Sequence, residues 1–550
     1  MTDARLGSVV LETDVAIPRR DGIVLRADVY RPSGPVRVPA LLMRLPYDKR
    51  QAQTYWYAAP AWYAERGYAV VVEDVRGRHR SGGHFVPLEH EAQDGLDLVA
   101  WAAEQAWCDA QVGSFGYSYC GLVQLLASGC AGDLPLRAIA PALSPPGLGD
   151  GCLLQAGVPA AAFLLTWAVE LGGLRLGSSA VEPFVLTRDL LRQLVLRPLD
   201  ELAACIPPEA CDWMRHWLRA DSEDGYWRSA SHQPAYGSIR AEALHVAGWY
   251  DTFRTGAIGH FQQLRRVDHR ALTSDRLVVG PWTHQPVRAD HTSPLAGPDP
   301  AGWQIDDMQL SFFDAVLRGG NVAEGALVRV AGLNTPDVWT GTAWPPPEAV
   351  PSAWFLGSRG GANGRDGDGL LTDQGVSSCP PDHLVYNHAD PVPAVGGDDC
   401  GDPDLVDMGP ADQERVERRR DVLVYTSPPV SRETSYFGEA EATLYVMTTG
   451  ASTQWLVRVC LVTANGVSVN VAETVARCPT TPGEVTPVRL FVGPVAFRLH
   501  RGERVRLHVT QGSSPRWAGL RDDCGELAVT HSIVLHDPAH PSCLRLSQVA

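Results

Sequence analysis

The chain has 550 residues, of which 45% are hydrophobic and 20% are charged, and its formal net charge is −16. This length exceeds what one hydrophobic core ordinarily supports and predicts roughly two to four domains. The composition is that of a globular protein, which excludes a disordered or collagen-like chain. The acidic charge argues against a general nucleic-acid or anionic-membrane partner.

The N-terminal segment and the cysteines predict a cytoplasmic protein. Residues 1–8 have no apolar core of signal-peptide length, and no apolar run is long enough to span a bilayer. The 12 cysteines form no C-x-x-C pair and no zinc-finger spacing with histidine, so we expect reduced, mostly buried thiols. We expect no cofactor and no metal, because His79, His84 and His90 lack the i, i+4 spacing of a helical ligand pair.

Strand and helix patterns alternate over residues 1–150. Asp21-Gly22 between two alternating runs predicts a β-hairpin, and an amphipathic pattern predicts a helix over 93–104. The segments that favour strands are 12–18, 23–30, 39–45, 68–75, 110–115 and 136–141. Alternation at this spacing predicts a doubly wound α/β domain, in which ligands bind at the carboxyl ends of the strands.

One glycine-rich turn lies between a predicted strand and an apolar helix over 122–127. Its sequence is Gly113-Ser114-Phe115-Gly116-Tyr117-Ser118-Tyr119-Cys120-Gly121. This context is typical of a nucleophile elbow, in which a strained turn lifts the serine hydroxyl clear of the sheet at the positive end of a helix. The second glycine comes one position late, so an ordinary serine in a glycine-rich loop is the alternative for this segment alone. We expect Cys120 to pack rather than react.

The pattern changes twice after the first 150 residues. Over 151–238 apolar residues recur at helical spacing, which predicts a helical cap inserted over the strand ends. The α/β pattern then resumes, with strands over 243–251 and 276–284 that stop at Asp251 and His284, and a helix over 308–317. The predicted domains are therefore 1–150 and 239–325 for an α/β core, 151–238 for the cap, and 326–550 for a C-terminal unit.

The C-terminal unit is rich in proline, glycine and short β-patterned runs. Strands are predicted at 422–425, 442–446, 456–462 and 504–509, which indicates a β-sandwich or jelly roll. The glycine-rich, acidic segments 358–369 and 392–401 are expected to be surface loops.

Ser118, Asp251 and His284 occur in the chain order of α/β-hydrolases. A serine hydroxyl needs an imidazole to accept its proton, and the imidazole needs a carboxylate that orients it and stabilises its positive charge. Asp251 alone reads as a solvated or capping aspartate, and His284 is one of 17 histidines. Each becomes a candidate because its strand stops at that residue.

Several motifs together resemble the CocE/NonD hydrolases, the cocaine esterase and X-prolyl dipeptidyl-peptidase superfamily. The resemblance runs from about Val15 to Leu546. The motifs are Ile17-Pro18, Arg20-Asp21-Gly22, Asp28-Val29-Tyr30-Arg31-Pro32, Pro46-Tyr47-Asp48-Lys49, Asp74-Val75-Arg76-Gly77, Gln105-Ala106-Trp107, Gly116-Tyr117-Ser118-Tyr119-Cys120-Gly121, Gly248-Trp249-Tyr250-Asp251, Gly280-Pro281-Trp282-Thr283-His284, Ser514-Pro515-Arg516 and His540-Pro541-Ser542.

The resemblance implies an α/β-hydrolase domain with an inserted helical cap, followed by a C-terminal jelly roll. It implies Ser118 as nucleophile, His284 as general base and then acid, and Asp251 as the residue that orients His284. It also implies an oxyanion hole made by the Tyr47 hydroxyl and the backbone N–H of Tyr119. Read without the resemblance, Tyr47 is a buried aromatic residue on a turn.

Four aromatic residues are candidates for the substrate pocket, with ordinary core packing as the alternative for each. They are Trp167, Trp249, Tyr250 and Phe253.

The predicted function is hydrolysis of a small-molecule carboxylic ester or amide through an acyl-enzyme on Ser118. One alternative is an acyltransferase of secondary metabolism, in which an amine or alcohol replaces water. Another is an X-prolyl peptidase, which needs an acidic group such as Glu170 or Asp221 for the substrate amine. A silent binding protein is disfavoured by the intact Ser-Asp-His set, and homo-oligomerisation stays open.

Overall fold

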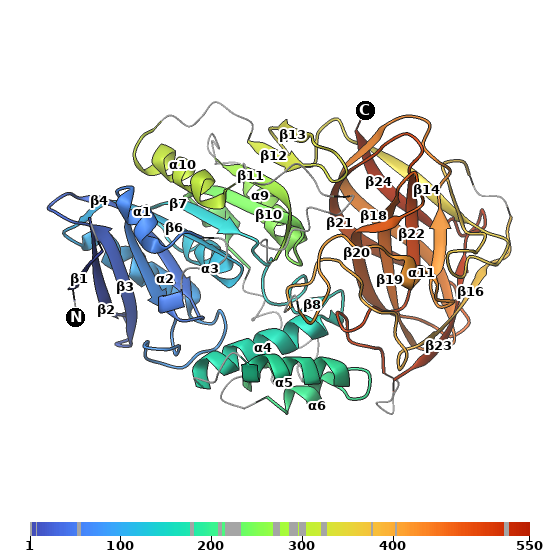
Figure 1. Cartoon of the computed structure of the whole chain (residues 1–550), viewed down its shortest axis with the longest axis horizontal. Helices are drawn as coiled ribbons and strands as arrows, with labels where there is room; N and C mark the ends of the chain where they lie inside the picture. Colours follow the sequence, from blue (N-terminus) through green and yellow to red (C-terminus); the bar gives the residue numbers. More distant parts are fainter. Residues whose placement is uncertain are drawn as a thin grey trace.

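The computed structural model describes residues 3–6, 8–51, 57–176, 181–206, 212–214, 233–267, 275–284, 295, 304–320, 327–375, 378–401, 404–521 and 527–549. Figure 1 shows two sheet-containing bodies side by side, with a group of helices below them. The first body is formed by chain segments that come before and after the helical group in the sequence.

The first body is built on an 11-stranded sheet in the order β1-β2-β3-β5-β4-β6-β7-β10-β11-β12-β13. The pairs from β5 through β12 are parallel, and those at the two ends of the sheet are antiparallel. Its strands are β1 (Asp3–Leu6), β2 (Val9–Pro18), β3 (Val24–Pro32), β4 (Val38–Leu45), β5 (Ala69–Asp74), β6 (Cys108–Tyr117), β7 (Leu136–Ala142), β10 (Glu242–Tyr250), β11 (Arg276–Thr283), β12 (Val328–Ala331) and β13 (Val338–Gly341). The predicted hairpin and the predicted parallel strands are confirmed.

Helices cover both faces of this sheet because its strands are apolar on both sides. Leu42 of β4 packs in one core with α2 (Glu91–Glu104), α3 (Tyr119–Ser128) and α9 (Arg254–Arg265). Leu41, the residue before it, packs in the opposite core with α1 (Pro60–Glu65) and α10 (Ile305–Leu317). Alternate residues of one strand therefore serve two cores, which confirms the doubly wound α/β architecture.

The helical insertion follows β7 and precedes β10. It contains the short strands β8 (Leu154–Gln155) and β9 (Val158–Pro159) and the helices α4 (Ala161–Leu176), α5 (Val181–Gln193) and α6 (Leu199–Ala203). These helices lie beneath both sheet-containing bodies (Figure 1). Glu170 is exposed on α4, whereas Asp221 lies outside the described residues.

The second body is β-rich. Ten strands follow the order β16-β23-β18-β24-β14-β15-β17-β22-β19-β20, and β21 pairs with β18. Its elements are β14 (Val350–Gly357), β15 (Leu370–Thr372), β16 (Asp382–Asn387), α11 (Glu414–Glu417), β17 (Leu423–Thr426), β18 (Thr434–Thr448), β19 (Ser452–Val462), β20 (Ser468–Pro479), β21 (Thr486–Leu499), β22 (Arg504–Thr510), β23 (Val529–Leu535) and β24 (Cys543–Val549). The strands β12 and β13 follow residue 326, the expected start of the C-terminal unit, yet they pair within the first sheet.

The loop over 392–401 departs from the sequence expectation. It was expected at the surface, but Asp398 and Asp399 are 6% and 3% exposed. Asp398 forms ion pairs with Arg254 and Arg516, and these charges compensate for its removal from water. The helix α1 was also missed, because its six residues are too few to establish a helical periodicity.

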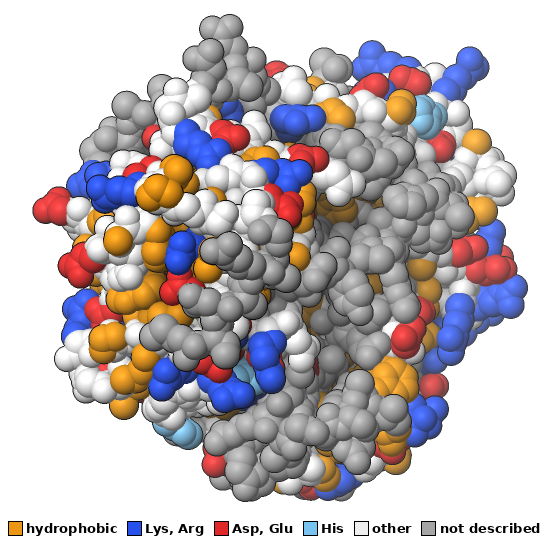
Figure 2. Space-filling model, turned by 60° about the vertical axis from the view of Figure 1, so that its left-hand side comes forward, with side chains coloured by type: hydrophobic (Ala, Val, Ile, Leu, Met, Phe, Trp, Pro, Cys, Tyr) orange, Lys and Arg blue, Asp and Glu red, His pale blue; other side chains and the backbone are white. Residues whose placement is uncertain are grey.

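The face of the molecule in Figure 2 carries interspersed acidic and basic side chains. Of the helices that the structure describes, none has the length and apolar character that crossing a membrane requires.

Candidate active site

The turn at Ser118 has the geometry of a nucleophile elbow. It joins β6 directly to α3, and Ser118 itself has φ 58° and ψ −127°. A non-glycine residue with positive φ is strained, and such strain is concentrated at functional sites. Ser118 is the N-cap residue of α3, but its side chain makes no capping hydrogen bond. Its hydroxyl is therefore free to serve a partner outside the helix.

Two glycines allow this turn to pack. A Cβ on Gly116 would lie 2.6 Å from the Cβ of Cys120, and a Cβ on Gly121 would lie 2.0 Å from the Oγ of Ser144. The late glycine is thus required where α3 passes the end of β7. Cys120 is 6% exposed and packs in the core, as expected.

The candidate triad is connected by two hydrogen bonds. The Nδ1 of His284 lies 2.7 Å from the Oδ1 of Asp251, and its Nε2 lies 3.1 Å from the Oγ of Ser118. Asp251 is fully buried and its ionised carboxylate accepts hydrogen bonds, so Nδ1–H donates to it and Nε2 accepts from the serine hydroxyl. Three parallel strands, β6, β10 and β11, bring these residues together because their carboxyl ends meet at one edge of the sheet.

Tyr47 lies near the site and has a defined hydrogen-bond partner. Its hydroxyl accepts a hydrogen bond from the Nε1 of Trp167, at 3.1 Å, on helix α4 of the insertion. The phenolic hydrogen therefore remains available to another acceptor. Burial raises the pKa of Tyr47 well above its usual range, so the phenol stays protonated.

The loop that carries Tyr47 is held by buried charges. The backbone N–H of Lys49 donates to the Oδ1 of Asp74 at 2.7 Å, and the Nε of Arg78 donates to the carbonyl of Pro46 at 2.9 Å. Lys49, Asp74 and Arg78 are each at most 2% exposed. The sequence motifs around Tyr47 and Asp74 thus form one structural unit.

Tyr119 follows Ser118 as the first residue of α3, so its backbone N–H has no acceptor within the helix. Its side chain donates from the hydroxyl to the Oε1 of Glu91 at 2.6 Å. Glu91 is 3% exposed and forms an ion pair of 2.7 Å with Arg44. The elbow therefore rests on a buried carboxylate that sequence reasoning missed. The sequence signal that could have identified Glu91 is its place as an acidic residue in the first turn of α2, a helix that packs against the sheet.

Aromatic rings surround the imidazole of His284. The ring of Phe253 meets it edge-on at 5.1 Å, and the ring of Tyr117 lies 5.9 Å away. Phe163 packs against Phe253 at 5.7 Å and stacks on Trp167, also at 5.7 Å. The structure therefore places Phe253 and Tyr117 beside His284, and connects Trp167 to Phe253 through Phe163.

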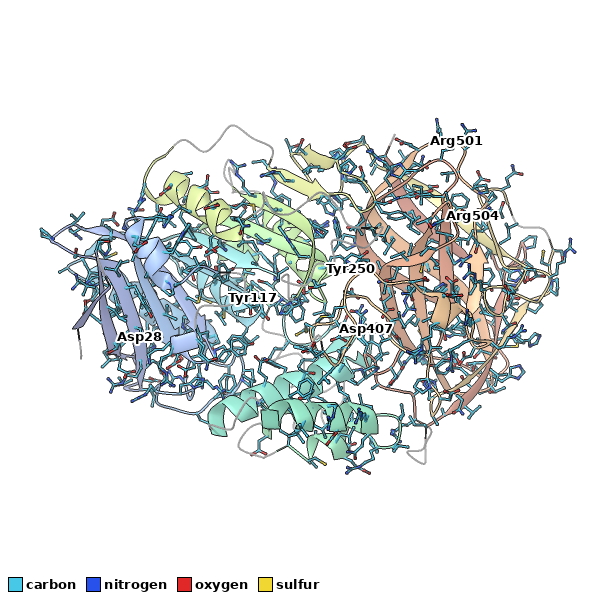
Figure 3. All side chains as sticks on the ribbon, in the orientation of Figure 1. Asp28, Tyr117, Tyr250, Asp407, Arg501 and Arg504 are labelled. Carbon is cyan, nitrogen blue, oxygen red and sulfur yellow. The ribbon has the colours of Figure 1, made fainter. Side chains whose placement is uncertain are left out.

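Trp249 and Tyr250 do not join these rings, and their assignment to the pocket is corrected. The indole of Trp249 donates to the carbonyl of Ala331 at 2.6 Å and lies 5.9 Å from the ring of Trp344. The Tyr250 hydroxyl donates to the carbonyl of Asn470 at 3.1 Å. Figure 3 shows Tyr117 and Tyr250 in the region between the two sheets. Both corrected side chains pack in the core shared with the β-rich body.

Within the described part of the chain, no group of three or more His, Cys, Asp or Glu side chains is arranged to hold a metal ion. The ten described cysteines are free thiols.

Two family models match the chain. The X-Pro dipeptidyl-peptidase (S15 family) model covers residues 21–286, and the X-Pro dipeptidyl-peptidase C-terminal non-catalytic domain model covers residues 325–545. The cocaine esterase of Rhodococcus sp. is 30% identical, with 98% of this chain and 98% of that protein covered.

Solved structures show the same fold at lower identity. An aminopeptidase from a marine sediment archaeon, Thaumarchaeota archaeon, has a TM-score of 0.85 and 19% identity, and covers 99% of this chain and 97% of its own. An α-amino acid ester hydrolase has a TM-score of 0.81 and 20% identity, with 98% and 97% covered. The chain therefore belongs to the CocE/NonD hydrolases of the cocaine esterase and X-prolyl dipeptidyl-peptidase superfamily, and it is a serine hydrolase that cleaves ester or amide bonds.

Proposed function

We propose that Ser118, His284 and Asp251 are the catalytic triad of a carboxylic ester hydrolase. The observation that carries this assignment is the continuous hydrogen-bonded path from the Ser118 Oγ through His284 to Asp251. It supports attack by Oγ on the substrate carbonyl while Nε2 of His284 takes the hydroxyl proton. The same proton then passes to the leaving group, and a water molecule activated by His284 releases the acyl group.

The oxyanion hole is proposed to consist of the Tyr47 hydroxyl and the backbone N–H of Tyr119. The free phenolic hydrogen of Tyr47 and the unpaired position of the Tyr119 amide at the start of α3 support this pair. Two donors at the developing oxyanion stabilise the tetrahedral intermediate more than the planar ester.

The substrate class is a small-molecule ester with an aromatic or otherwise apolar group. The rings of Phe253, Phe163, Trp167 and Tyr117 support this choice, since apolar walls bind apolar acyl or leaving groups. The cocaine esterase relative supports an ester over an X-prolyl amide. The net charge of −16 supports a small-molecule partner over nucleic acid or an anionic membrane.

The finer architecture is also a proposal. The β-rich body is proposed to be a jelly roll, and the order of its long antiparallel strands supports this interpretation. The hydrolase body is proposed to comprise residues 1–150 and the segment from 239 through β13, which ends at Gly341, with residues 151–238 as the cap. The second hydrolase segment thus extends beyond the expected boundary at 325, because β12 and β13 pair in the first sheet. A cytoplasmic location is supported by the ten free thiols.

A fluorophosphonate probe and a substrate panel test this function. The wild type is expected to be labelled, and it is expected to hydrolyse p-nitrophenyl esters faster than X-Pro p-nitroanilides. Ser118→Ala is expected to lose both the labelling and the hydrolysis. Ser114→Ala is the matched control, because Ser114 lies on β6, the strand that leads into Ser118, and its hydroxyl donates to the Leu42 carbonyl. Labelling that persists in Ser118→Ala would reject Ser118 as the nucleophile.

A further inference from the structure

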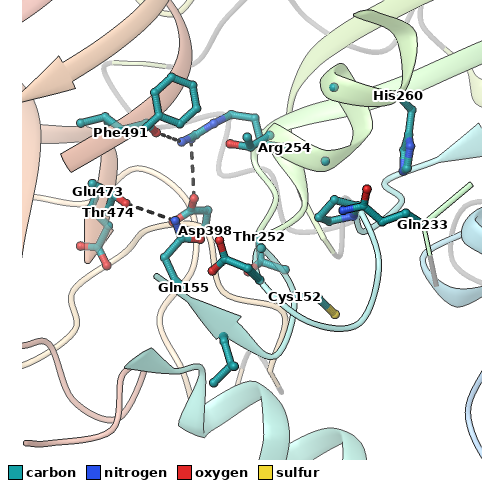
Figure 4. Close-up of a pocket in the computed structure, with 18 of the residues that line it drawn as sticks. Cys152, Gln155, Gln233, Thr252, Arg254, His260, Asp398, Glu473, Thr474 and Phe491 are labelled. Atoms are coloured by element: carbon teal, nitrogen blue, oxygen red, sulfur yellow. Dashed lines mark hydrogen bonds and ion pairs between the residues drawn. The ribbon is translucent and has the colours of Figure 1, made fainter. Parts of the chain in front are cut away.

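The segment that carries Asp251 contacts the C-terminal sheet on both sides of that residue. Tyr250, one residue before it, donates its hydroxyl to the Asn470 carbonyl of β20 at 3.1 Å. Arg254, three residues after it, donates from Nη2 to the Val492 carbonyl of β21 at 3.1 Å. Figure 4 shows Arg254 reaching from helix α9 toward the strand that carries Phe491. Two strands of the C-terminal body therefore hold the main chain around Asp251.

The acceptor on β21 lies in a β-bulge. Gly493 is paired with Ala440 and Phe491 is paired with Glu441, so Val492 is the extra residue without a partner on β18. A bulge releases the polar groups of the extra residue from the ladder and changes their direction. The carbonyl of Val492, which has no pairing partner on β18, instead accepts the hydrogen bond from Arg254.

The second acceptor lies beside another bulge, and a glycine permits the close approach. Asn470 flanks Val471, which is the extra residue where β20 pairs with β19. Gly493 has φ +92°, and a Cβ there would lie 2.7 Å from the Oγ1 of Thr255 in the first turn of α9. These two irregularities, in β21 and in β20, therefore coincide with the contacts of the C-terminal sheet to the segment around Asp251.

Arg254 makes two contacts within this segment and two contacts with the C-terminal body. Its side chain is 4% exposed, and its Nη1 donates to the Trp249 carbonyl at 2.8 Å. The same nitrogen lies 3.6 Å from a carboxylate oxygen of Asp398, and its backbone N–H donates to the Asp251 carbonyl at 3.0 Å. The guanidinium of Arg254 therefore connects the carbonyl of Trp249, which precedes Asp251, to Asp398 and to Val492 of the C-terminal body.

We propose that the C-terminal domain is part of the catalytic apparatus and that Arg254 is the positioning residue through which it fixes Asp251. The carboxylate of Asp251 is fully buried, and its Oδ2 has no hydrogen-bond partner among the described residues. Its orientation toward His284 therefore depends on the main chain that Tyr250 and Arg254 hold. This role rests on the triad proposed above, and it gives a mechanistic function to a domain whose family description calls it non-catalytic.

A cavity makes this contact accessible to experiment. Arg254 lines a cavity of about 280 Å³ together with Thr252, Asp398 and Arg516 (Figure 4). Truncation of Arg254 to alanine would open space toward this cavity, so a small guanidinium ion from solution can reach the vacated position. Asp398 and the Val492 carbonyl would remain there to bind it.

The test is pre-steady-state hydrolysis of p-nitrophenyl acetate by Arg254→Ala, with active sites counted by a fluorophosphonate. Misplacement of a catalytic group by about 1 Å costs about 100-fold, so we expect the acylation and deacylation rate constants to fall between about tenfold and 100-fold. The number of titratable sites and KM are expected to stay within about twofold of the wild type. Arg254→Lys is expected to be intermediate, and millimolar guanidinium chloride is expected to increase the rate of Arg254→Ala but not of the wild type.

Arg516→Ala is the matched control. Arg516 lines the same cavity and pairs with the same Asp398, but among the described residues its guanidinium pairs with Asp398 and Glu473 and not with residues 249–254. We expect it to lower thermal stability or the number of active sites while the rate constants per site are retained. A loss of sites with unchanged rate constants in Arg254→Ala, or an equal loss of rate in Arg516→Ala, would overturn the proposal.

Two further variants keep the outcome decisive. If Arg254→Ala does not fold, Tyr250→Phe removes one hydroxyl from the other side of Asp251, and wild-type rate constants in that variant would reject the role of the C-terminal contacts. Ser118→Ala tests the underlying function separately. A burst that persists in Ser118→Ala contradicts the triad itself, whereas a burst lost there and unchanged in the other variants contradicts only the positioning role.

Discussion

Replacing Tyr47 by phenylalanine tests the proposed oxyanion hole with the smallest change available. The ring and its packing are retained, and only the hydroxyl is deleted. That hydroxyl accepts the indole N–H of Trp167 at 3.1 Å, and its own hydrogen is proposed to bond the oxyanion. Deletion therefore removes a donor from the transition state and leaves the Trp167 N–H without this acceptor.

The two consequences differ in size and in the property that they change. Loss of one oxyanion donor typically lowers kcat by about 10²–10³-fold, which corresponds to about 3–4 kcal/mol of transition-state stabilisation. KM should change little, because the planar ester makes the weaker bond. The unpaired indole N–H of Trp167 costs about 1–3 kcal/mol of folding stability. Because burial raises the pKa of Tyr47 above its usual range, the wild type should retain this donor to alkaline pH.

The assay is steady-state hydrolysis of p-nitrophenyl esters, with thermal unfolding measured in parallel. Tyr63→Phe is the matched control, since its buried hydroxyl donates to Asp306 on the face of the sheet covered by α1 and α10. The control should lose stability but keep kcat. A kcat for Tyr47→Phe within about threefold of the wild type would show that Tyr47 is not an oxyanion donor.

Three further variants probe the triad, the elbow and the pH dependence of folding. Asp251→Asn should lower kcat by about 10⁴-fold through the wrong imidazole tautomer, and a loss below about tenfold would contradict the assignment. Gly121→Ala should reduce the yield of folded protein, because its Cβ would lie 2.0 Å from Ser144 Oγ; wild-type expression and activity would contradict this geometry. Burial lowers the pKa of His260 to about 4, so stability should fall as pH drops from about 6.5 to 4, by up to about 3 kcal/mol. In denaturant unfolding, the unfolding free energy of His260→Gln should fall less steeply with decreasing pH over that range. An unchanged pH dependence would assign the loss of stability to other groups.

Much of the hydrolase body could be predicted because its signals are local. Buried parallel strands are nearly continuous apolar runs, and Ser118, Asp251 and His284 come directly after three of them. The position of a polar residue at the end of such a strand decides which edge of the sheet it reaches. For this reason the sequence predicted the members of the hydrogen-bonded path, although the family resemblance was needed to select Tyr47.

The residues that were missed or misplaced depend on contacts distant in sequence. Trp249 and Tyr250 directly precede Asp251 in the sequence, but their side chains bond to the carbonyls of Ala331 and Asn470 in the core shared with the β-rich body. Arg254 has the pattern of a solvated charge in a first helical turn, and only the bulge at Val492 reveals its partner. No local pattern encodes a partner more than 200 residues away.

The hairpin of β12 and β13 has a consequence for dividing the chain. β12 pairs in parallel with β11, and the N–H of Leu277 donates to the carbonyl of Leu327 at 2.9 Å. A hydrolase fragment that stopped at residue 325 would leave β11 as an unprotected edge strand, with open peptide groups that invite pairing between molecules. Such a fragment is expected to aggregate, so a hydrolase fragment should be cut or fused only after β13, which ends at Gly341.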